Sequence, residues 1–323
     1  MLKYPGISKD TKKPYGPVTC NSLLIGHWSV MSQPQNVIAL VYDYDKTLSP
    51  LHMQEDVIFE KIGVNSKEFW GRVDHLASDK TYESDLAWIR LLLDNLFFRN
   101  LSNNDLSKMG KELNFFPGIP KIFEELDSIL SDEKFVRHGI TLEHYIVTSG
   151  LQAVLAGSDL AKYVKRIFGC EFDEDGQGKV YWPKRVISHT AKTQYLFRIT
   201  KGFEYMNFEK DVNDHVPEIE RRIPFRNMLY IGDGPTDVPC FSVITSRGGK
   251  ALAVYDADSK HSFETCMSLM AAQRVNEIAE ADYRRGTHLR RIIEYMVYRM
   301  AEQIVAHQDM EHDSRVIHAP KHG

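Results

Sequence analysis

Cysteine is scarce in this sequence, and no two cysteines lie close together. Four occur among the 323 residues, and they are widely separated: Cys20, Cys170, Cys240 and Cys266. Disulfide frameworks and zinc sites both place cysteines at short, repeated spacings, so this pattern argues against either kind of site. We therefore expect the four thiols to be buried side chains of a cytoplasmic protein.

Long apolar runs and a large net charge are also missing. No apolar run approaches the ~20 residues that a membrane-spanning helix needs, and the first residues, MLKYPGISKDTKKPYGP, lack the basic-then-apolar order of a signal peptide. A formal charge of −4 gives no bulk attraction to nucleic acid or an anionic membrane, so we expect neither as a partner. Hydrophobic residues make up 43% of the chain, which is enough for a packed core.

The order of apolar patterns divides the chain into parts. Residues 1–35 are rich in Pro, Gly, Lys and Ser, and we expect an irregular extension. Residues 36–50 contain VIALVYDYD, a run typical of a strand buried on both faces of a parallel sheet. Residues 51–114 have helical spacing without a strand signal, whereas strands and helices alternate over 115–306 and 307–323 is a polar tail. The fold class predicted is α/β, with a Rossmann-like parallel-sheet core and an inserted α-helical unit.

Finer patterns predict individual elements of the core. Helical spacing predicts helices over 151–168, 261–280 and 287–306. Turn residues between two short runs predict a hairpin over 171–182. Residues 203–222 are highly charged, and we interpret them as a surface insertion.

Three of the predicted strands end in polar groups, namely DYD after VIALVY, TSG after YIV, and GDG after MLYI. In an open parallel sheet, ligands bind outside the carboxyl ends of the strands. Each motif alone has an ordinary explanation, because acids at strand ends cap helices and small residues turn the chain. Their combination favours one functional site, whose expected side chains are Asp43, Asp45, Thr148, Ser149, Asp233 and Asp237.

Such a group of carboxylates would repel itself, because like charges at short range raise one another's pKa. A divalent cation relieves the repulsion, and oxygen ligands of this kind suit Mg²⁺. A lysine could contribute a further positive charge, and Lys192 precedes the GDG strand at the start of a predicted helix. The sequence therefore predicts a magnesium site with Lys192 beside it.

These motifs resemble those of a known family. DYDKTLS, IVTSG, Lys192 within TAKTQYLF, and IGDGPTD are similar to the four motifs of the haloacid dehalogenase-like (HAD) superfamily, and the resemblance spans about residues 36–300. A helical insertion directly after the first motif is similar to the C1 cap of the phosphoserine phosphatase-like branch. FPGIPKIFEEL also resembles the segment where that branch returns to its core.

The resemblance implies a role for each matching residue. Asp43 would be the nucleophile that forms an aspartyl-phosphate, and Asp45 would be the general acid and base. The carboxylates of Asp43 and Asp233 and the backbone carbonyl of Asp45 would bind Mg²⁺. Lys192 would neutralise charge beside the phosphate, and Asp237 would orient it. The remaining residues implied at the site are Thr47, Thr148, Ser149 and Gly150 around the phosphoryl group, and Gly232 and Gly234 as supports.

The function that follows is a Mg²⁺-dependent phosphatase acting on a small phosphorylated metabolite. A phosphomutase or phosphotransferase would use the same residues, and a non-catalytic binding module is a third hypothesis. The acid at Asp45 favours phosphoryl transfer, because the dehalogenases of the superfamily lack it. Glu55 and Asp56 lie further from Asp43 than the cap glutamate of phosphoserine phosphatases does from its nucleophile, so the resemblance does not extend to phosphoserine specificity.

Overall fold

A computed structural model describes residues 34–203 and 212–317. The predicted extension 1–35 lies almost wholly outside the described residues, as does the last part of the predicted tail. The predicted insertion 203–222 is described at its first residue and from 212 onward. There it consists of turns and one short 3-10 helix, η5 (Glu218–Glu220).

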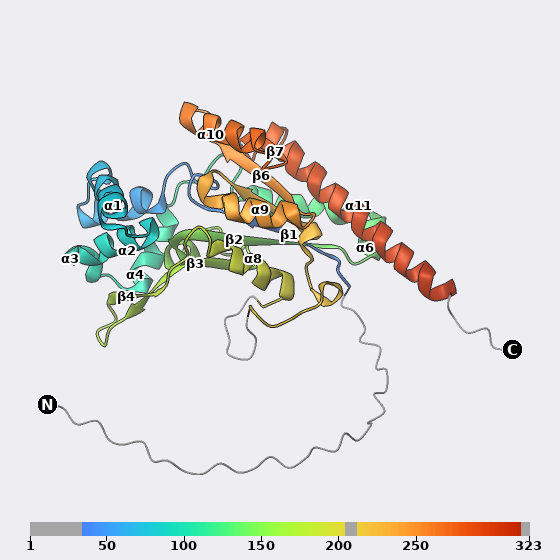
Figure 1. The fold of residues 1–323 in the computed structure, drawn as a ribbon, viewed down its shortest axis with the longest axis horizontal. Coiled ribbons are helices and arrows are strands. Elements are labelled where there is room, and N and C mark those ends of the chain that lie inside the picture. The colour runs from blue at the N-terminus through green and yellow to red at the C-terminus, as the bar shows by residue number, and fades with distance from the viewer. Residues whose placement is uncertain (1–33, 204–211, 318–323) are drawn as a thin grey trace, which may run out of the picture. The chain divides into compact units, whose positions relative to one another are not determined.

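The core is a seven-stranded sheet in the order β4-β3-β2-β1-β5-β6-β7 (Figure 1). Neighbouring strands run parallel, except that β4 pairs antiparallel with β3 as the predicted hairpin. All six residues of the central strand β1 are buried, as its uninterrupted apolar sequence predicts. The strands are β1 (Val37–Tyr42), β2 (Thr141–Leu151), β3 (Arg166–Glu174), β4 (Val180–Arg185), β5 (Met228–Gly232), β6 (Lys250–Tyr255) and β7 (Glu277–Glu280).

Aromatic contacts show which helices cover each face of the sheet. Tyr42 of β1 packs edge-on against Phe123 of α5 (Lys121–Leu126). Its neighbour Val41 lies in register with Tyr230 of β5, so Tyr230 points to the opposite face. There Tyr230 packs against Phe241 of α9 (Val238–Ser246). The sheet is therefore covered on both faces, as parallel sheets are.

The segment between β1 and β2 folds as the predicted helical unit, which we call the cap. No strand occurs in residues 51–114, all of which the structure describes. Ser102 begins one cap helix with a capping box, in which it and Asp105 bond each other's backbone N–H groups. The helices are η1 (Gln54–Ile58), η2 (Glu60–Ile62), α1 (Ser66–Lys80), α2 (Ser84–Asp94), α3 (Leu96–Arg99), α4 (Asn103–Met109) and η3 (Gly110–Glu112).

The helix predicted over 151–168 is wrong beyond its first turn. Helix α7 covers only Gln152–Ala156, and residues from Arg166 onward form β3. A Cβ at Gly157 would lie 1.7 Å from the backbone oxygen of Ser107 in α4, so the chain turns there under a close backbone contact. The following apolar run pairs with β2 as strand β3. The sequence was ambiguous there, because a short buried run fits an interior strand as well as a helix.

Two further boundaries differ from the prediction. The helix predicted over 261–280 ends early, because α10 (Lys260–Ala271) is followed by a turn at Gln273, with φ of 54°, and then by β7. The last helix, α11 (His288–Ile317), continues beyond the predicted boundary at 306 into the predicted polar tail. Its polar residues from His307 include no proline or glycine before Pro320, so nothing in the local sequence stops the helix.

The cysteines match their prediction where they are described. Cys170, Cys240 and Cys266 are buried free thiols, and Cys20 lies outside the described residues. Of the helices that the structure describes, none combines the length and the apolar composition needed to cross a membrane.

Candidate active site

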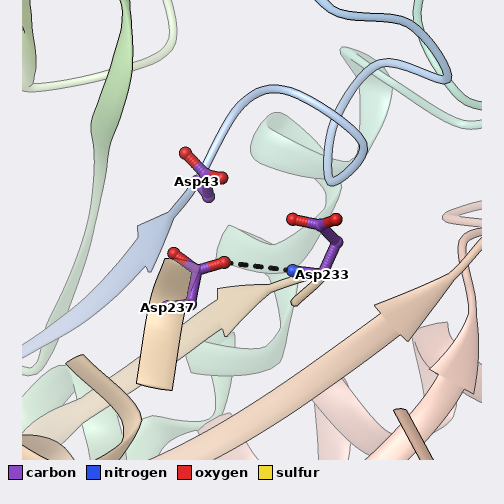
Figure 2. A group of neighbouring side chains, drawn as sticks. All are labelled: Asp43, Asp233 and Asp237. Atoms are coloured by element: carbon purple, nitrogen blue, oxygen red, sulfur yellow. Dashed lines mark hydrogen bonds between the residues drawn. The ribbon is translucent and has the colours of Figure 1, made fainter. Parts of the chain in front are cut away.

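The carboxyl ends of β1 and β5 place two aspartates side by side. The backbone N–H of Asp43 donates a 2.9 Å hydrogen bond to the carbonyl oxygen of Ile231, so Asp43 continues the pairing of the two strands. Asp233 directly follows Gly232, the last residue of β5. Figure 2 shows both carboxylates at this edge of the sheet, with that of Asp237 beside them. The sheet therefore brings together the acids of the DYD and GDG motifs, as predicted.

Lys192 lies in the middle of this group. Its side-chain nitrogen is 2.9 Å from Oδ1 of Asp43 and 2.8 Å from Oδ1 of Asp237, and only 1% of Lys192 is exposed. Burial alone would lower the pKa of Lys192, but the carboxylates of Asp237 and Asp43 outweigh it and raise the pKa well above its usual value. Lys192 is thus held as a buried cation between two acids at the start of α8 (Lys192–Lys201).

Asp237 is held by three donors and is itself fully buried. The Tyr230 hydroxyl donates to Oδ1 at 2.7 Å and Lys192 donates to the same oxygen, while the backbone N–H of Asp233 donates to Oδ2 at 3.2 Å. Gly232 makes room for it, since a Cβ at Gly232 would lie 2.3 Å from Oδ2. These bonds fix the Asp237 carboxylate beside Lys192.

The carboxylates of Asp43, Asp233 and Asp237 are arranged to hold a cation. One ligand oxygen from each lies within 4.8 Å of the others. Burial raises the pKa of Asp43 to about 7, and burial also raises the pKa of Asp233 well above its usual value. Buried, mutually repelling carboxylates favour a bound divalent cation. With Asp237 already engaged, the residues present fit Mg²⁺ through Asp43 and Asp233, together with backbone oxygen and water.

Asp45 lies at the junction of core and cap. Its Oδ1 accepts a 2.8 Å hydrogen bond from the backbone N–H of Met53, the residue before η1. Burial raises the pKa of Asp45 to about 6, although the bond from Met53 opposes the rise. A carboxyl group with a pKa near neutrality can both give and take a proton, which suits a general acid and base.

The hydroxylated residues expected around a phosphoryl group lie at the same edge of the sheet, the two threonines buried and Ser149 partly exposed. Thr148 is fully buried and its Oγ1 accepts a 2.9 Å hydrogen bond from the backbone N–H of Gly150. Thr47 is also fully buried, and its Oγ1 has no hydrogen-bond partner among the described residues. Ser149 belongs to the same strand, β2, where the pairing with β3 shifts register between Val147 and Leu151. The TSG motif is therefore part of an irregular strand end.

Two of the three glycines of the predicted site lie where a larger residue would not fit. A Cβ at Gly150 would lie 2.3 Å from the Met53 side chain and 3.3 Å from Oδ2 of Asp45, so a larger residue would crowd the site. At Gly234 the surrounding space is open and the backbone is extended. The structure thus explains Gly150 and Gly232 by close packing and shows no requirement for glycine at Gly234.

Comparison with known structures identifies the architecture. A substrate-bound phosphoserine phosphatase superposes with a TM-score of 0.50 at 14% identity, covering 80% of this chain and 98% of that one. A probable phosphoserine phosphatase from Vibrio cholerae also gives a TM-score of 0.50, at 15% identity, covering 84% of this chain and 68% of that one. The chain has a HAD-like fold of the phosphoserine phosphatase type. This confirms the predicted fold class.

A relative in sequence is known as well. An uncharacterised protein of Borreliella burgdorferi is 31% identical over 285 residues, which cover 80% of this chain and 96% of that protein. The two proteins belong to one family. No protein-family model matches the chain.

Sequence reasoning missed several groups that surround this site. The Met53 amide and the Tyr230 hydroxyl, which bond Asp45 and Asp237, carry no signal in the sequence, since a backbone amide and a strand tyrosine occur everywhere. The sequence did offer a signal for Asp85, which lies 3.7 Å from Nε2 of His189, shortly before Lys192 in the chain. It is an acid within the apolar run of α2, where burial is costly without a purpose.

Proposed function

We propose that this chain is a Mg²⁺-dependent phosphatase that hydrolyses a small phosphate monoester through an aspartyl-phosphate intermediate. The observation that carries the proposal is Lys192, buried between Asp43 and Asp237 at 2.9 and 2.8 Å. An anionic nucleophile can attack an anionic phosphate only where positive charge is fixed beside both. A buried lysine bonded to the nucleophile itself provides that charge.

In the first step, a carboxylate oxygen of Asp43 attacks phosphorus and the bond from phosphorus to the ester oxygen breaks. The protonated carboxyl of Asp45 gives its proton to the departing oxygen, which leaves as an alcohol. The Met53 hydrogen bond fixes Asp45 for this transfer. The products are the alcohol and a phosphorylated Asp43.

In the second step, Asp45, now ionised, takes a proton from water as the water oxygen attacks phosphorus. The bond between phosphorus and the Asp43 oxygen breaks, which restores the carboxylate and releases inorganic phosphate. Asp45 is again protonated and ready for the next cycle, so protons balance over the two steps.

Binding of the phosphoryl group uses side chains and backbone around the strand ends. Thr47 and Thr148 present buried hydroxyl oxygens there, and the backbone N–H of Ser149 completes the set that we assign to its oxygens. The backbone N–H of Gly150 donates to Oγ1 of Thr148 and holds that hydroxyl in place. The carboxylates of Asp43 and Asp233 and the backbone carbonyl of Asp45 would hold Mg²⁺. When bound, the ion neutralises charge on the phosphoryl oxygens and makes phosphorus a better electrophile.

The experiment that tests this function measures phosphate release from p-nitrophenyl phosphate. We expect hydrolysis with Mg²⁺, loss of activity in EDTA, and recovery when Mg²⁺ is restored. Asp43→Asn should be inactive, whereas Asp94→Asn, which changes an exposed aspartate of α2, should retain the activity. Inactivity of the wild-type protein on every aryl and alkyl phosphate, or full activity after exhaustive chelation, would contradict the proposal.

A further inference from the structure

A tyrosine from the last part of the core contacts the turn that carries the active-site acids. Tyr283 lies between β7 and α11, and its hydroxyl donates a 2.8 Å hydrogen bond to the backbone oxygen of Thr47. Both residues are fully buried, although they lie 236 positions apart in the chain. The bond therefore joins the C-terminal part of the core to the turn that follows β1.

That turn contains a residue in a strained conformation. Lys46, between Asp45 and Thr47, has a φ of 59°, which lies in the left-handed region. A residue with a Cβ enters that region at a cost in free energy, which the surrounding contacts must outweigh. Within the turn, the backbone N–H groups of Thr47 and Leu48 donate to the carbonyl oxygen of Tyr44 at 3.1 and 2.8 Å. These local bonds close the turn, but contacts from outside it decide where the turn lies.

Tyr283 and the segment after the cap hold the turn from outside. Tyr283 binds the carbonyl oxygen of Thr47, and the backbone N–H of Phe116 donates to the carbonyl oxygen of Leu48 at 2.9 Å. Tyr283 is itself held, because its backbone N–H donates a 2.8 Å hydrogen bond to the backbone oxygen of Pro117. The turn, the chain returning from the cap and the loop after β7 are therefore bonded to one another.

The Tyr283 hydroxyl is suited to act as a permanent donor. Burial and the negative charge of Asp233 raise its pKa, so the proton stays on the oxygen at neutral pH. Without that donor, the carbonyl oxygen of Thr47 would lose a buried partner, and an unpaired buried acceptor is costly. Asp233 is one of the carboxylates proposed to hold Mg²⁺, so Tyr283 lies close to the site whose turn it binds.

We propose that Tyr283 is a positioning residue that holds the turn at Lys46 in its left-handed conformation. By fixing the turn, it sets Asp45 and Thr47 in the active site. The inference rests on the proposed phosphatase function. Tyr283 acts through the backbone of Thr47, whereas the Met53 amide fixes the Asp45 carboxylate directly. Loss of the Tyr283 hydroxyl should therefore release the turn and weaken proton transfer by Asp45.

The first test uses leaving groups that differ in their need for a proton. In Tyr283→Phe, kcat/KM on ethyl phosphate should fall by about tenfold more than kcat/KM on p-nitrophenyl phosphate, because only the alkoxide must be protonated as it leaves. A loss of folded protein lowers both values by the same factor, so their ratio reports the position of Asp45. Tyr298→Phe, which removes a hydroxyl of α11 bonded to Lys134, should keep the wild-type ratio. An unchanged ratio in folded Tyr283→Phe would overturn the proposal.

The second test relieves the strain at Lys46. Glycine adopts a φ near 59° without the cost of a Cβ, so Lys46→Gly should make the Tyr283 bond less necessary. Lys46→Ala is the matched control, because it loses the same amine, which donates to the Pro50 oxygen, but keeps the Cβ. Added to Lys46→Ala, Tyr283→Phe should change the leaving-group ratio by about tenfold, and added to Lys46→Gly by about twofold or less. Equal changes in the two backgrounds would contradict the proposed role.

Thermal unfolding of the same variants gives a readout that does not depend on activity. Tyr283→Phe should lower the unfolding temperature less in the Lys46→Gly background than in the Lys46→Ala background. An equal decrease, or failure of both double variants to fold, would show that Tyr283 supports the core as a whole, and the proposal would be wrong. Inactivity of the wild-type protein on every ester is a failure of the phosphatase function, and the unfolding temperatures still decide whether Tyr283 holds the turn.

Discussion

The backbone N–H of Met53 donates a 2.8 Å hydrogen bond to Oδ1 of Asp45. Met53 begins the cap, and its sulfur accepts a 3.0 Å hydrogen bond from the backbone N–H of Leu151 at the end of β2. One cap residue therefore contacts both the acid after β1 and the strand end that carries Thr148. The position of the cap thus bears directly on the group that we propose as general acid and base.

Asp45→Asn should separate the two steps of the reaction. The amide cannot give or take the proton, but nitrophenolate leaves without one, so the first step should survive with p-nitrophenyl phosphate. The second step should stall because no base activates water. Rapid mixing should therefore give a burst of about one equivalent of nitrophenolate per site, followed by slow turnover.

An alkyl phosphate serves as the control for the same variant. Its alkoxide is a very poor leaving group without a proton, so little or no burst of alcohol is expected. Equal loss on both esters and no burst, in a variant shown to be folded, would contradict the role assigned to Asp45.

Lys192→Met should impair both catalysis and stability. The change removes the cation beside the nucleophile, and we expect kcat on p-nitrophenyl phosphate to fall by about 10²-fold or more. It also leaves the buried carboxylates of Asp43 and Asp237 without their partner, which should lower the free energy of unfolding by about 3–5 kcal/mol. Urea unfolding measures the second effect. Lys67→Met, an exposed change on α1, is the matched control, and equal behaviour of the two variants would refute the prediction.

Gly150→Ala should lower activity more than stability, whereas Gly157→Ala should mainly lower stability. An alanine Cβ at Gly150 would meet the flexible Met53 side chain at 2.3 Å and Asp45 at 3.3 Å, so Gly150→Ala should lower kcat more than stability. At Gly157 the Cβ would lie 1.7 Å from the backbone oxygen of Ser107. A backbone atom, unlike the Met53 side chain, cannot move aside freely. Gly157→Ala should therefore lower the thermal unfolding temperature more than Gly150→Ala does. The reverse ranking in kcat and in unfolding temperature would show that these contacts are misassigned.

His144 should make the protein less stable in acid. Burial lowers the pKa of His144 to about 4 in the folded state, whereas an unfolded histidine has a pKa of about 6.5. Between these two pKa values, the unfolded chain binds a proton that the folded chain does not. The contribution of neutral His144 to the free energy of unfolding is therefore fully present above about pH 6.5 and is lost as the pH falls toward 4. The loss amounts to about 3 kcal/mol.

Urea unfolding at several pH values checks this prediction. His144→Gln should flatten the decline in the free energy of unfolding between neutral pH and pH values near the folded pKa. His261→Gln, which changes an exposed histidine of α10, should keep the wild-type decline. If the two variants lose stability in acid alike, His144 is not the group responsible.

The sequence by itself determined the central strands β1 and β5 and the acids that follow them. VIALVY and MLYI are uninterrupted apolar runs, and such runs become interior strands because only a sheet covered on both faces buries every side chain. Parallel strands then bring their carboxyl ends to one edge, and the observed pairing of β1 with β5 puts Asp43 and Asp233 side by side there. The capping box at Ser102 is equally local, because both of its bonds join residues three apart.

Only the tertiary structure decided how those acids are held and which neighbours they have. Asp45 is held by a backbone amide of the cap, and a strand hydroxyl is one of the three donors to Asp237; neither group is marked by residue type. The pairing of Asp85 with His189 joins residues from separate parts of the chain. Where apolar spacing suited a helix or a strand alike, as after Ala156 and Ala271, pairing with the existing sheet made the choice. Local sequence fixes which groups are available, but burial and the packing of distant segments determine the charge and contacts that each group acquires.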